Sequence, residues 1–145
     1  MGKVNIEGNY FVSSSKEKVT ELLSNMQMIS KCLKGLEEIK ELKENSLSSK
    51  IKISEGLVRG IFNLEANLKK DLDNLLIDFK LYGTLGRAEG LITLKLTQVE
   101  KNSTNISYKA DLEVKGLGAT LAKKQISELA EKILKEILDC FNNLK

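Results

Sequence analysis

The chain has 145 residues, of which 41% are hydrophobic and 30% are charged, and its net charge is +3. These proportions are typical of a globular protein and exclude a disordered chain. The small basic excess consists almost entirely of lysine, whereas a nucleic-acid-binding surface would more often carry clustered arginines or stacking aromatic side chains. We therefore expect a single domain, residues 1–145, that binds no nucleic acid.

The sequence contains no histidine, which limits the chemistry available to it. Catalytic systems of the Ser-His-Asp and Cys-His kinds are excluded, together with the usual general base near neutral pH. We therefore expect no catalytic residues and no enzyme activity. The two cysteines, Cys32 and Cys140, do not suffice for a four-ligand zinc site. We expect no metal and two reduced thiols, as in the cytosol.

No stretch of the sequence predicts a membrane span. The first residues lack the apolar core of a signal peptide, and no apolar run approaches the ~18 residues that a spanning helix needs. We therefore expect a cytoplasmic protein with at most peripheral membrane contact. No motif in the sequence indicates a cofactor, and we expect none.

The first part of the chain changes from a strand pattern to a helix pattern. Apolar and polar residues alternate along Val4–Val12, which predicts a strand. A capping box that begins at Ser14 then predicts the start of a short helix. Asn25 can cap a second short helix, Met26–Leu33, and Gly35 suits its left-handed end.

The middle of the chain alternates with a period of two almost throughout, and turn residues separate the alternating segments. Each segment has one apolar face, which predicts an antiparallel meander with one side in water. The predicted strands are Leu36–Lys43, Leu47–Ser54, Leu75–Tyr82, Leu91–Thr97 and Ile106–Val114, together with a longer strand after Gly56 in which Phe62, Leu64, Ala66 and Leu68 share a face.

The last segment, Leu117–Lys145, has apolar residues at the three-four spacing of one helix face. A helix of this length runs roughly 40 Å. We expect Leu129 and Ile133 at the centre of its buried face and Lys132 on the solvent side.

A sheet with one apolar face and a long amphipathic helix bury each other if the sheet curls around the helix. The sequence therefore predicts an α+β helix-grip. It consists of a curled, seven-stranded antiparallel sheet around the C-terminal helix, with two short helices after the first strand.

This order of elements resembles the START-like (SRPBCC) superfamily and, within it, the family of the carbon monoxide dehydrogenase G subunit. Four segments carry the resemblance, namely residues 7–12, 31–37, 83–90 and 108–116. The family usually has Cys-Leu-Pro-Gly where this chain has Cys32-Leu33-Lys34-Gly35.

The resemblance implies an apolar cavity between sheet and helix that holds lipids, quinones, sterols or polyketides in other members. Tyr108 and Gln125 are the polar side chains expected to reach it, although plain core packing also explains inward-facing residues of this kind. The predicted ligand-binding residues are Phe62, Leu64, Ile77, Phe79, Leu81, Ile92, Leu94, Tyr108, Leu121, Ala122, Gln125 and Leu129.

The leading hypothesis for function is therefore a non-catalytic carrier or accessory protein for a lipophilic small molecule. By the resemblance, it would serve a molybdenum-type dehydrogenase. Two alternatives remain. One is an enzyme similar to polyketide cyclases and aromatases, in which Tyr108 or a lysine acts on a bound chain. The other is an adaptor with a filled core that binds a partner protein through its surface.

Overall fold

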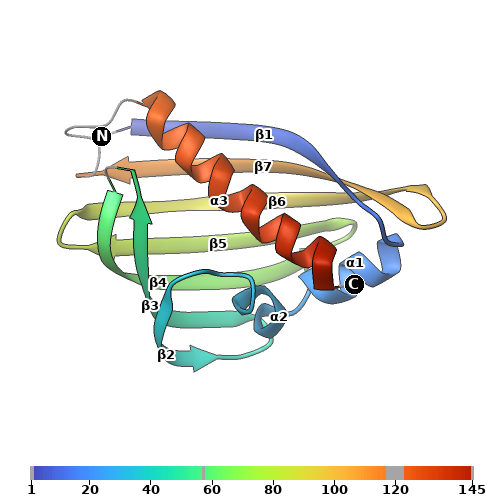
Figure 1. Ribbon diagram of the computed structural model, residues 1–145, viewed down its shortest axis with the longest axis horizontal. Helices are drawn as coiled ribbons and strands as arrows, with labels where there is room; N and C mark the ends of the chain where they lie inside the picture. The colour runs from blue at the N-terminus through green and yellow to red at the C-terminus, as the bar shows by residue number, and fades with distance from the viewer. Residues whose placement is uncertain (1, 57, 117–122, 145) are drawn as a thin grey trace.

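The computed structural model describes residues 2–56, 58–116 and 123–144 (Figure 1). The order of elements is that of the predicted α+β helix-grip. In chain order they are β1 (Gly2–Val12), α1 (Lys16–Leu23), α2 (Met26–Ser30), β2 (Leu36–Leu42), β3 (Ser46–Glu55), β4 (Val58–Asp71), β5 (Asn74–Gly83), β6 (Gly86–Glu100), β7 (Ser103–Lys115) and α3 (Lys123–Leu144).

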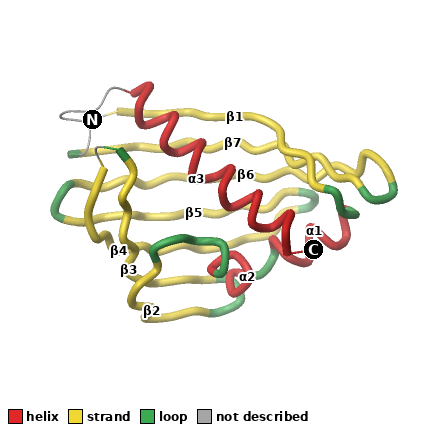
Figure 2. The backbone as a smooth tube through the Cα atoms, in the orientation of Figure 1, coloured by secondary structure: helices red, strands yellow, loops and turns green. Residues whose placement is uncertain are grey.

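The strands form one seven-stranded sheet in the order β1-β7-β6-β5-β4-β3-β2, and every neighbouring pair is antiparallel. All the predicted strands are confirmed, and most are longer than the sequence indicates. The reason is that the hairpins after β4, β5 and β6 have two-residue turns, at residues 72–73, 84–85 and 101–102. The long strands curl beneath α3, as the backbone trace shows (Figure 2).

The first short helix begins one residue later than predicted. Ser15, not Ser14, is its N-cap, and the Ser15 side chain accepts a hydrogen bond of 3.2 Å from the backbone N–H of Lys18. This bond satisfies one of the amides that a helix start leaves without a partner.

The second short helix is capped by Asn25, as predicted, but it ends at Ser30 and not at Leu33. A loop of residues 31–35 follows and leads into β2. Gly35 in this loop has φ +86°, and its carbonyl accepts a hydrogen bond of 2.8 Å from the backbone N–H of Lys52. A Cβ on Gly35 would lie 2.2 Å from the Lys52 carbonyl oxygen. Glycine therefore allows this loop to lie directly against β3.

The long helix α3 crosses the sheet diagonally, from β1 towards α1 and α2 (Figure 1). Its C-terminal half packs into the core, where Leu138 is 1% exposed and Leu134 and Phe141 are also buried. Leu129 and Ile133 are only partly buried. The most deeply packed part of α3 therefore lies closer to the C-terminus than the predicted centre. The predicted helical residues 117–122 lie outside the described ranges.

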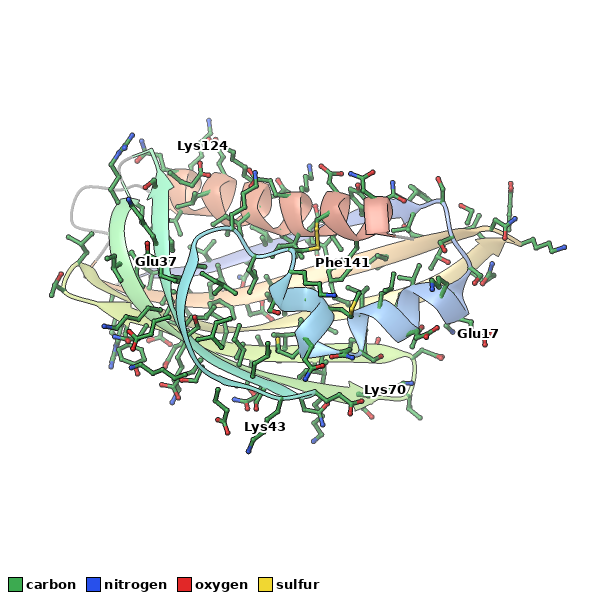
Figure 3. All side chains as sticks on the ribbon, turned by 60° about the horizontal axis from the view of Figure 1, so that its bottom comes forward. Glu17, Glu37, Lys43, Lys70, Lys124 and Phe141 are labelled. Atoms are coloured by element: carbon green, nitrogen blue, oxygen red, sulfur yellow. A yellow bond between two sulfur atoms is a disulfide. The ribbon has the colours of Figure 1, made fainter. Side chains whose placement is uncertain are left out.

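The prediction of two reduced cysteines is wrong for this structure. Cys32, in the loop after α2, forms a disulfide with Cys140 of α3, and their Cα atoms are 5.6 Å apart (Figure 3). The two residues are separated by 108 positions in the sequence, so only the folded chain brings them together. The disulfide joins the C-terminal part of α3 to the loop of residues 31–35.

Removing the disulfide is expected to lower the free energy of unfolding by about 2–5 kcal/mol, because a cross-link across a long loop restricts the unfolded chain. The change is Cys32→Ala combined with Cys140→Ala, and urea denaturation under non-reducing conditions measures the effect. A reducing agent should shift the midpoint of the wild-type protein and leave that of the double variant unchanged. Equal midpoints for oxidised wild type and double variant would contradict the expectation.

Because α3 is packed unequally along its length, substitutions by alanine at different positions are expected to lower the free energy of unfolding by different amounts. Leu138→Ala is expected to cost about 2–5 kcal/mol, because it opens a cavity in a fully buried site. Leu129→Ala should cost clearly less, because Leu129 is already partly exposed. Lys135→Ala, on the exposed side of the same helix, should cost under ~1 kcal/mol and is the control. Thermal and urea denaturation of the three variants give the ranking, and a larger loss at Leu129 than at Leu138 would reverse it.

Candidate functional site

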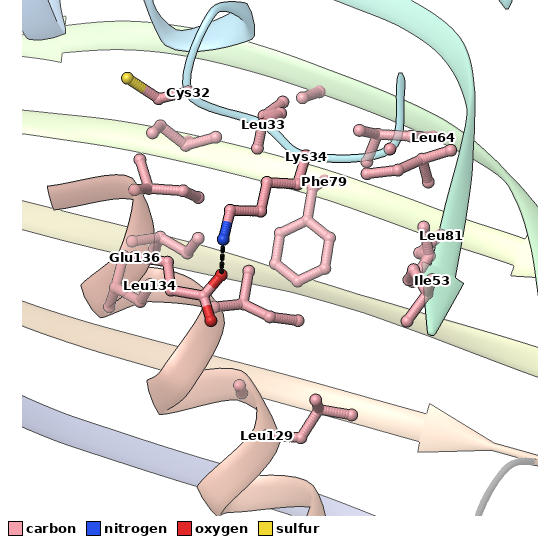
Figure 4. A pocket seen from close by; sticks show the side chains of 18 of the residues that line it. Cys32, Leu33, Lys34, Ile53, Leu64, Phe79, Leu81, Leu129, Leu134 and Glu136 are labelled. Atoms are coloured by element: carbon pink, nitrogen blue, oxygen red, sulfur yellow. Dashed lines mark ion pairs between the residues drawn. The ribbon is translucent and has the colours of Figure 1, made fainter. Parts of the chain in front are cut away.

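A cavity of about 610 Å³ lies between the concave face of the sheet and α3 (Figure 4). The short helices and the loop of residues 31–35 contribute the remaining wall. Its volume is in the usual range for sites that bind small molecules. Inward-facing residues of every strand except β2 give it an apolar interior, and from β2 only Leu36 and Glu37 line it.

The volume arises because several inward-facing residues are small. Ala66 of β4 lies opposite Phe79 of β5, and Ala88 of β6 lies opposite Leu81. Ala110 of β7 and Ala130 of α3 also line the cavity. A helix that crosses a curled sheet contacts all of its strands only if long side chains fill the gap. Alanine at these positions leaves the gap open.

Seven of the residues predicted for the site line the cavity. They are Leu64, Ile77, Phe79, Leu81, Ile92, Leu94 and Leu129. Phe62 does not line it: the side chain is 1% exposed, and a Cβ on Gly83 would lie 3.2 Å from its ring. Leu121 and Ala122 lie outside the described residues.

The two polar residues predicted for the site lie elsewhere. Gln125 is exposed and does not line the cavity. Tyr108 is 3% exposed, and its hydroxyl donates a hydrogen bond of 2.8 Å to Glu131 Oε2 on α3. Gly8 provides the space for this contact, because a Cβ there would lie 2.4 Å from the Tyr108 oxygen. Tyr108 is therefore a link between β7 and α3, and it does not line the cavity.

The polar residues that do line the cavity are ones that the sequence did not indicate. Lys34, Glu37, Lys52 and Ser54 are exposed, so they mark the place where the cavity opens to solvent. Glu55 and Glu136 also line it. We call these six residues the rim. They come from the loop of residues 31–35, the start of β2, the end of β3 and the middle of α3.

Two ion pairs connect α3 to the opposite side of the opening. Lys34 Nζ lies 3.4 Å from Glu136 Oε2, as the dashed line in Figure 4 shows, and Lys132 Nζ lies 2.8 Å from Glu55 Oε2. The hydrogen bond from Lys132 lowers the pKa of the Glu55 carboxyl, and the charge of Lys34 lowers it further. A sequence signal for this arrangement exists, since Lys132, Glu136 and Cys140 follow one another at intervals of four, along one side of a helix.

Within residues 2–56, 58–116 and 123–144, no helix is long and apolar enough to cross a membrane. The same ranges contain no group of three or more histidine, cysteine or acidic side chains placed to hold a metal ion.

The sheet curled around one long helix, with an apolar cavity between them, defines a helix-grip fold. The sequence profile of the carbon monoxide dehydrogenase G subunit (CoxG) matches residues 8–144. The chain therefore belongs to the CoxG family. No curated protein matches it significantly in sequence.

Solved structures support the fold. A conserved protein from Geobacillus kaustophilus superposes with a TM-score of 0.87 at 18% identity, covering 97% of this chain and 93% of the other. A START superfamily protein from Mycobacterium smegmatis gives 0.70 at 13% identity, covering 98% and 96%. A truncated norcoclaurine synthase from Thalictrum flavum also gives 0.70, at 15% identity, covering 99% and 93%. At these identities the likeness shows the fold alone.

The tyrosines predict a loss of stability at alkaline pH. Burial, together with hydrogen bonds to Glu131 and Asp139 respectively, raises the pKa of Tyr108 and of Tyr10 to about 12, from 10.0. In the unfolded chain both ionise near pH 10. Their contribution to stability is therefore complete below pH 10 and is lost as the pH rises towards 12.

We expect the free energy of unfolding to fall steeply between pH 10 and about pH 12 and the slope to be shallower in Tyr108→Phe. Urea denaturation across this range measures both slopes. Absorbance titration of the folded proteins provides the control, because the phenol missing from the variant should be one that ionises near pH 12 in wild type. Equal pH dependence of the free energy of unfolding in the two proteins would show that the pKa of Tyr108 is not raised in the folded state.

Proposed function

We propose that this chain is a non-catalytic carrier or accessory protein that binds one lipophilic molecule, of quinone or lipid type, in the cavity beneath α3. The observation that carries the proposal is the distribution of polarity over the cavity wall. Aliphatic and aromatic side chains line its interior, and the charged side chains that line it belong to the rim.

This distribution favours an amphiphile that enters tail first. Burying a polar group without a hydrogen-bond partner costs several kcal/mol, so the interior suits a hydrocarbon chain and not a polar head. A head group left at the rim would stay in water near Lys34 and Lys52. A quinone with an isoprenoid tail and a single-chain lipid both have this form.

Catalysis on the same fold is the main alternative, since norcoclaurine synthase superposes on the chain. A cyclase-like or aromatase-like reaction needs a reactive polar group beside the bound chain. The sequence offers Tyr108 or a lysine for that role. The Tyr108 hydroxyl is bonded to Glu131 and Tyr108 does not line the cavity, and the lysines that line it, Lys34 and Lys52, belong to the rim. This placement favours a carrier. The open cavity also argues against an adaptor with a filled core.

The proposal extends to partner and location. The family takes its name from a component of carbon monoxide dehydrogenase, and we propose a molybdenum-type dehydrogenase as the protein that the carrier serves. We propose the cytoplasm as its location, as the sequence predicts. The Cys32–Cys140 disulfide is an observation that favours an oxidising compartment instead.

Neighbouring residues of β5 provide a matched test of ligand binding. Leu81 lines the cavity, whereas Tyr82 is 41% exposed on the outer face of the sheet. Nile red, an uncharged solvatochromic probe, should bind the wild-type protein one-to-one with a micromolar Kd, about −8 kcal/mol. Leu81→Trp should weaken binding at least tenfold because the indole occupies the cavity, and Tyr82→Trp should not.

Thermal denaturation of both variants completes the test. The indole of Leu81→Trp enters empty space, so the midpoint should stay close to that of wild type. Overpacking in a filled core would instead cost about 1–3 kcal/mol. A wild-type protein that binds neither Nile red nor a menaquinone analogue, together with a destabilised Leu81→Trp variant, would exclude the carrier function.

A further inference from the structure

Three side chains on one side of α3 connect this helix to the opposite side of the cavity opening. Lys132 pairs with Glu55 at the end of β3, Glu136 pairs with Lys34 in the loop after α2, and Cys140 forms the disulfide with Cys32. The α3 residues lie four positions apart, so successive contacts are about 6 Å apart along the helix axis.

The four charged residues act on one another as a network. The hydrogen bond from Lys132 lowers the pKa of Glu55, and the charge of Lys34 lowers it further. The hydrogen bond to Glu55 raises the pKa of Lys132, and the charge of Glu136 raises it further. Cations and anions therefore alternate across the opening, from the loop to α3 and back to β3. A ligand passing between α3 and β3 has to separate these charges.

The three connections differ greatly in strength. The side chains of Lys34 and Lys132 are 83% and 57% exposed, and ion pairs in such positions are weak and sensitive to salt. The disulfide is covalent and lies beside the buried, C-terminal part of α3. The two sides of the opening can therefore separate at the ion pairs while they stay joined at the disulfide.

The loop side of the opening is held in place by the backbone. The Gly35 carbonyl accepts the hydrogen bond from Lys52, and the loop lies against β3 without room for a Cβ at Gly35. The loop and β3 thus form one wall. On the other wall, Leu129 and Ile133 of α3 are only partly buried. The Tyr108–Glu131 hydrogen bond joins this part of the helix to β7 and not to β3.

We propose that the ion pairs Lys34–Glu136 and Lys132–Glu55 form a gate across the cavity, which opens by separation of α3 from β3 about the Cys32–Cys140 disulfide. The gate controls how fast a ligand enters and leaves and contributes little to how tightly it binds. This inference rests on the proposed carrier function, because a gate requires a ligand that passes it.

The test measures rates and affinity separately. Stopped-flow fluorescence gives the association rate of Nile red and, with excess lipid vesicles as acceptor, its dissociation rate. In Glu136→Gln both rates should rise about two- to fivefold, the range set by one exposed ion pair, while Kd changes by less than about twofold. Lys135→Gln, which removes a charge from the exposed side of the same helix, should match wild type.

High salt and reversal of the charges of one ion pair provide two independent tests of the rates at which the probe enters and leaves. About 1 M NaCl should accelerate exchange in wild type and have little effect on a variant with both Glu136→Gln and Lys132→Gln, because the screened pairs are already absent. The combined exchange Lys34→Glu with Glu136→Lys should restore slow exchange. Reduction of the disulfide should accelerate exchange further, and unchanged rates in reduced protein would exclude the disulfide as the fixed point.

The outcomes separate this inference from the proposed function. Probe binding with identical rates in wild type and Glu136→Gln would overturn the gate and leave the carrier intact. A Kd that weakens in proportion to the dissociation rate would also overturn it, because Glu136 would then hold the ligand directly. Absence of probe binding in wild type would overturn both.

Discussion

The packing of α3 against the curled sheet is the interaction on which the rest of the structure depends. One helix is too narrow to cover seven strands, so part of the concave face of the sheet has no helix packed directly on it. The C-terminal part meets the short helices and the sheet, and Leu138 and Phe141 are buried there. The cavity lies between α3 and the sheet, where Ala66, Ala88 and Ala110 leave space, and residues of α3 from Ile126 to Phe141 line it.

An unfilled apolar space has an energetic consequence for the whole domain. Side chains at its wall lack partner atoms on one side and lose the dispersion energy of those contacts. The buried cluster at the C-terminal part of α3 and the disulfide beside it offset this loss. The most deeply buried side chains of α3 thus lie in its C-terminal half.

Much of the fold could be predicted because one face of the sheet is exposed to solvent and the other is buried. Each strand therefore alternates, and the alternation indicates all the strands from Val4 to Val114. The residues that line the cavity were harder to predict, because the rotation of α3 about its axis decides which of its side chains face the sheet. The sequence predicts Gln125 inside the cavity, but it is exposed, whereas its neighbour Ile126 lines the cavity. The disulfide and the ion pairs connect residues that are distant in sequence. Periodicity places Lys132, Glu136 and Cys140 on one side of α3 but does not indicate their partners.

The rotation of α3 also explains how one helix both lines the cavity and contacts the opposite side of its opening. Leu129, Ile133 and Ile137 form a stripe that faces the apolar space, and all three line it. Lys132, Glu136 and Cys140 form an adjacent stripe, displaced by one residue, which meets the loop after α2 and the end of β3. Because one residue corresponds to a turn of about 100°, the second stripe lies at the edge of the apolar face, where charges keep contact with water. A charge moved into the first stripe would lose its hydration, and an apolar residue moved into the second would be exposed to water. The position of the opening is therefore a consequence of the helical period.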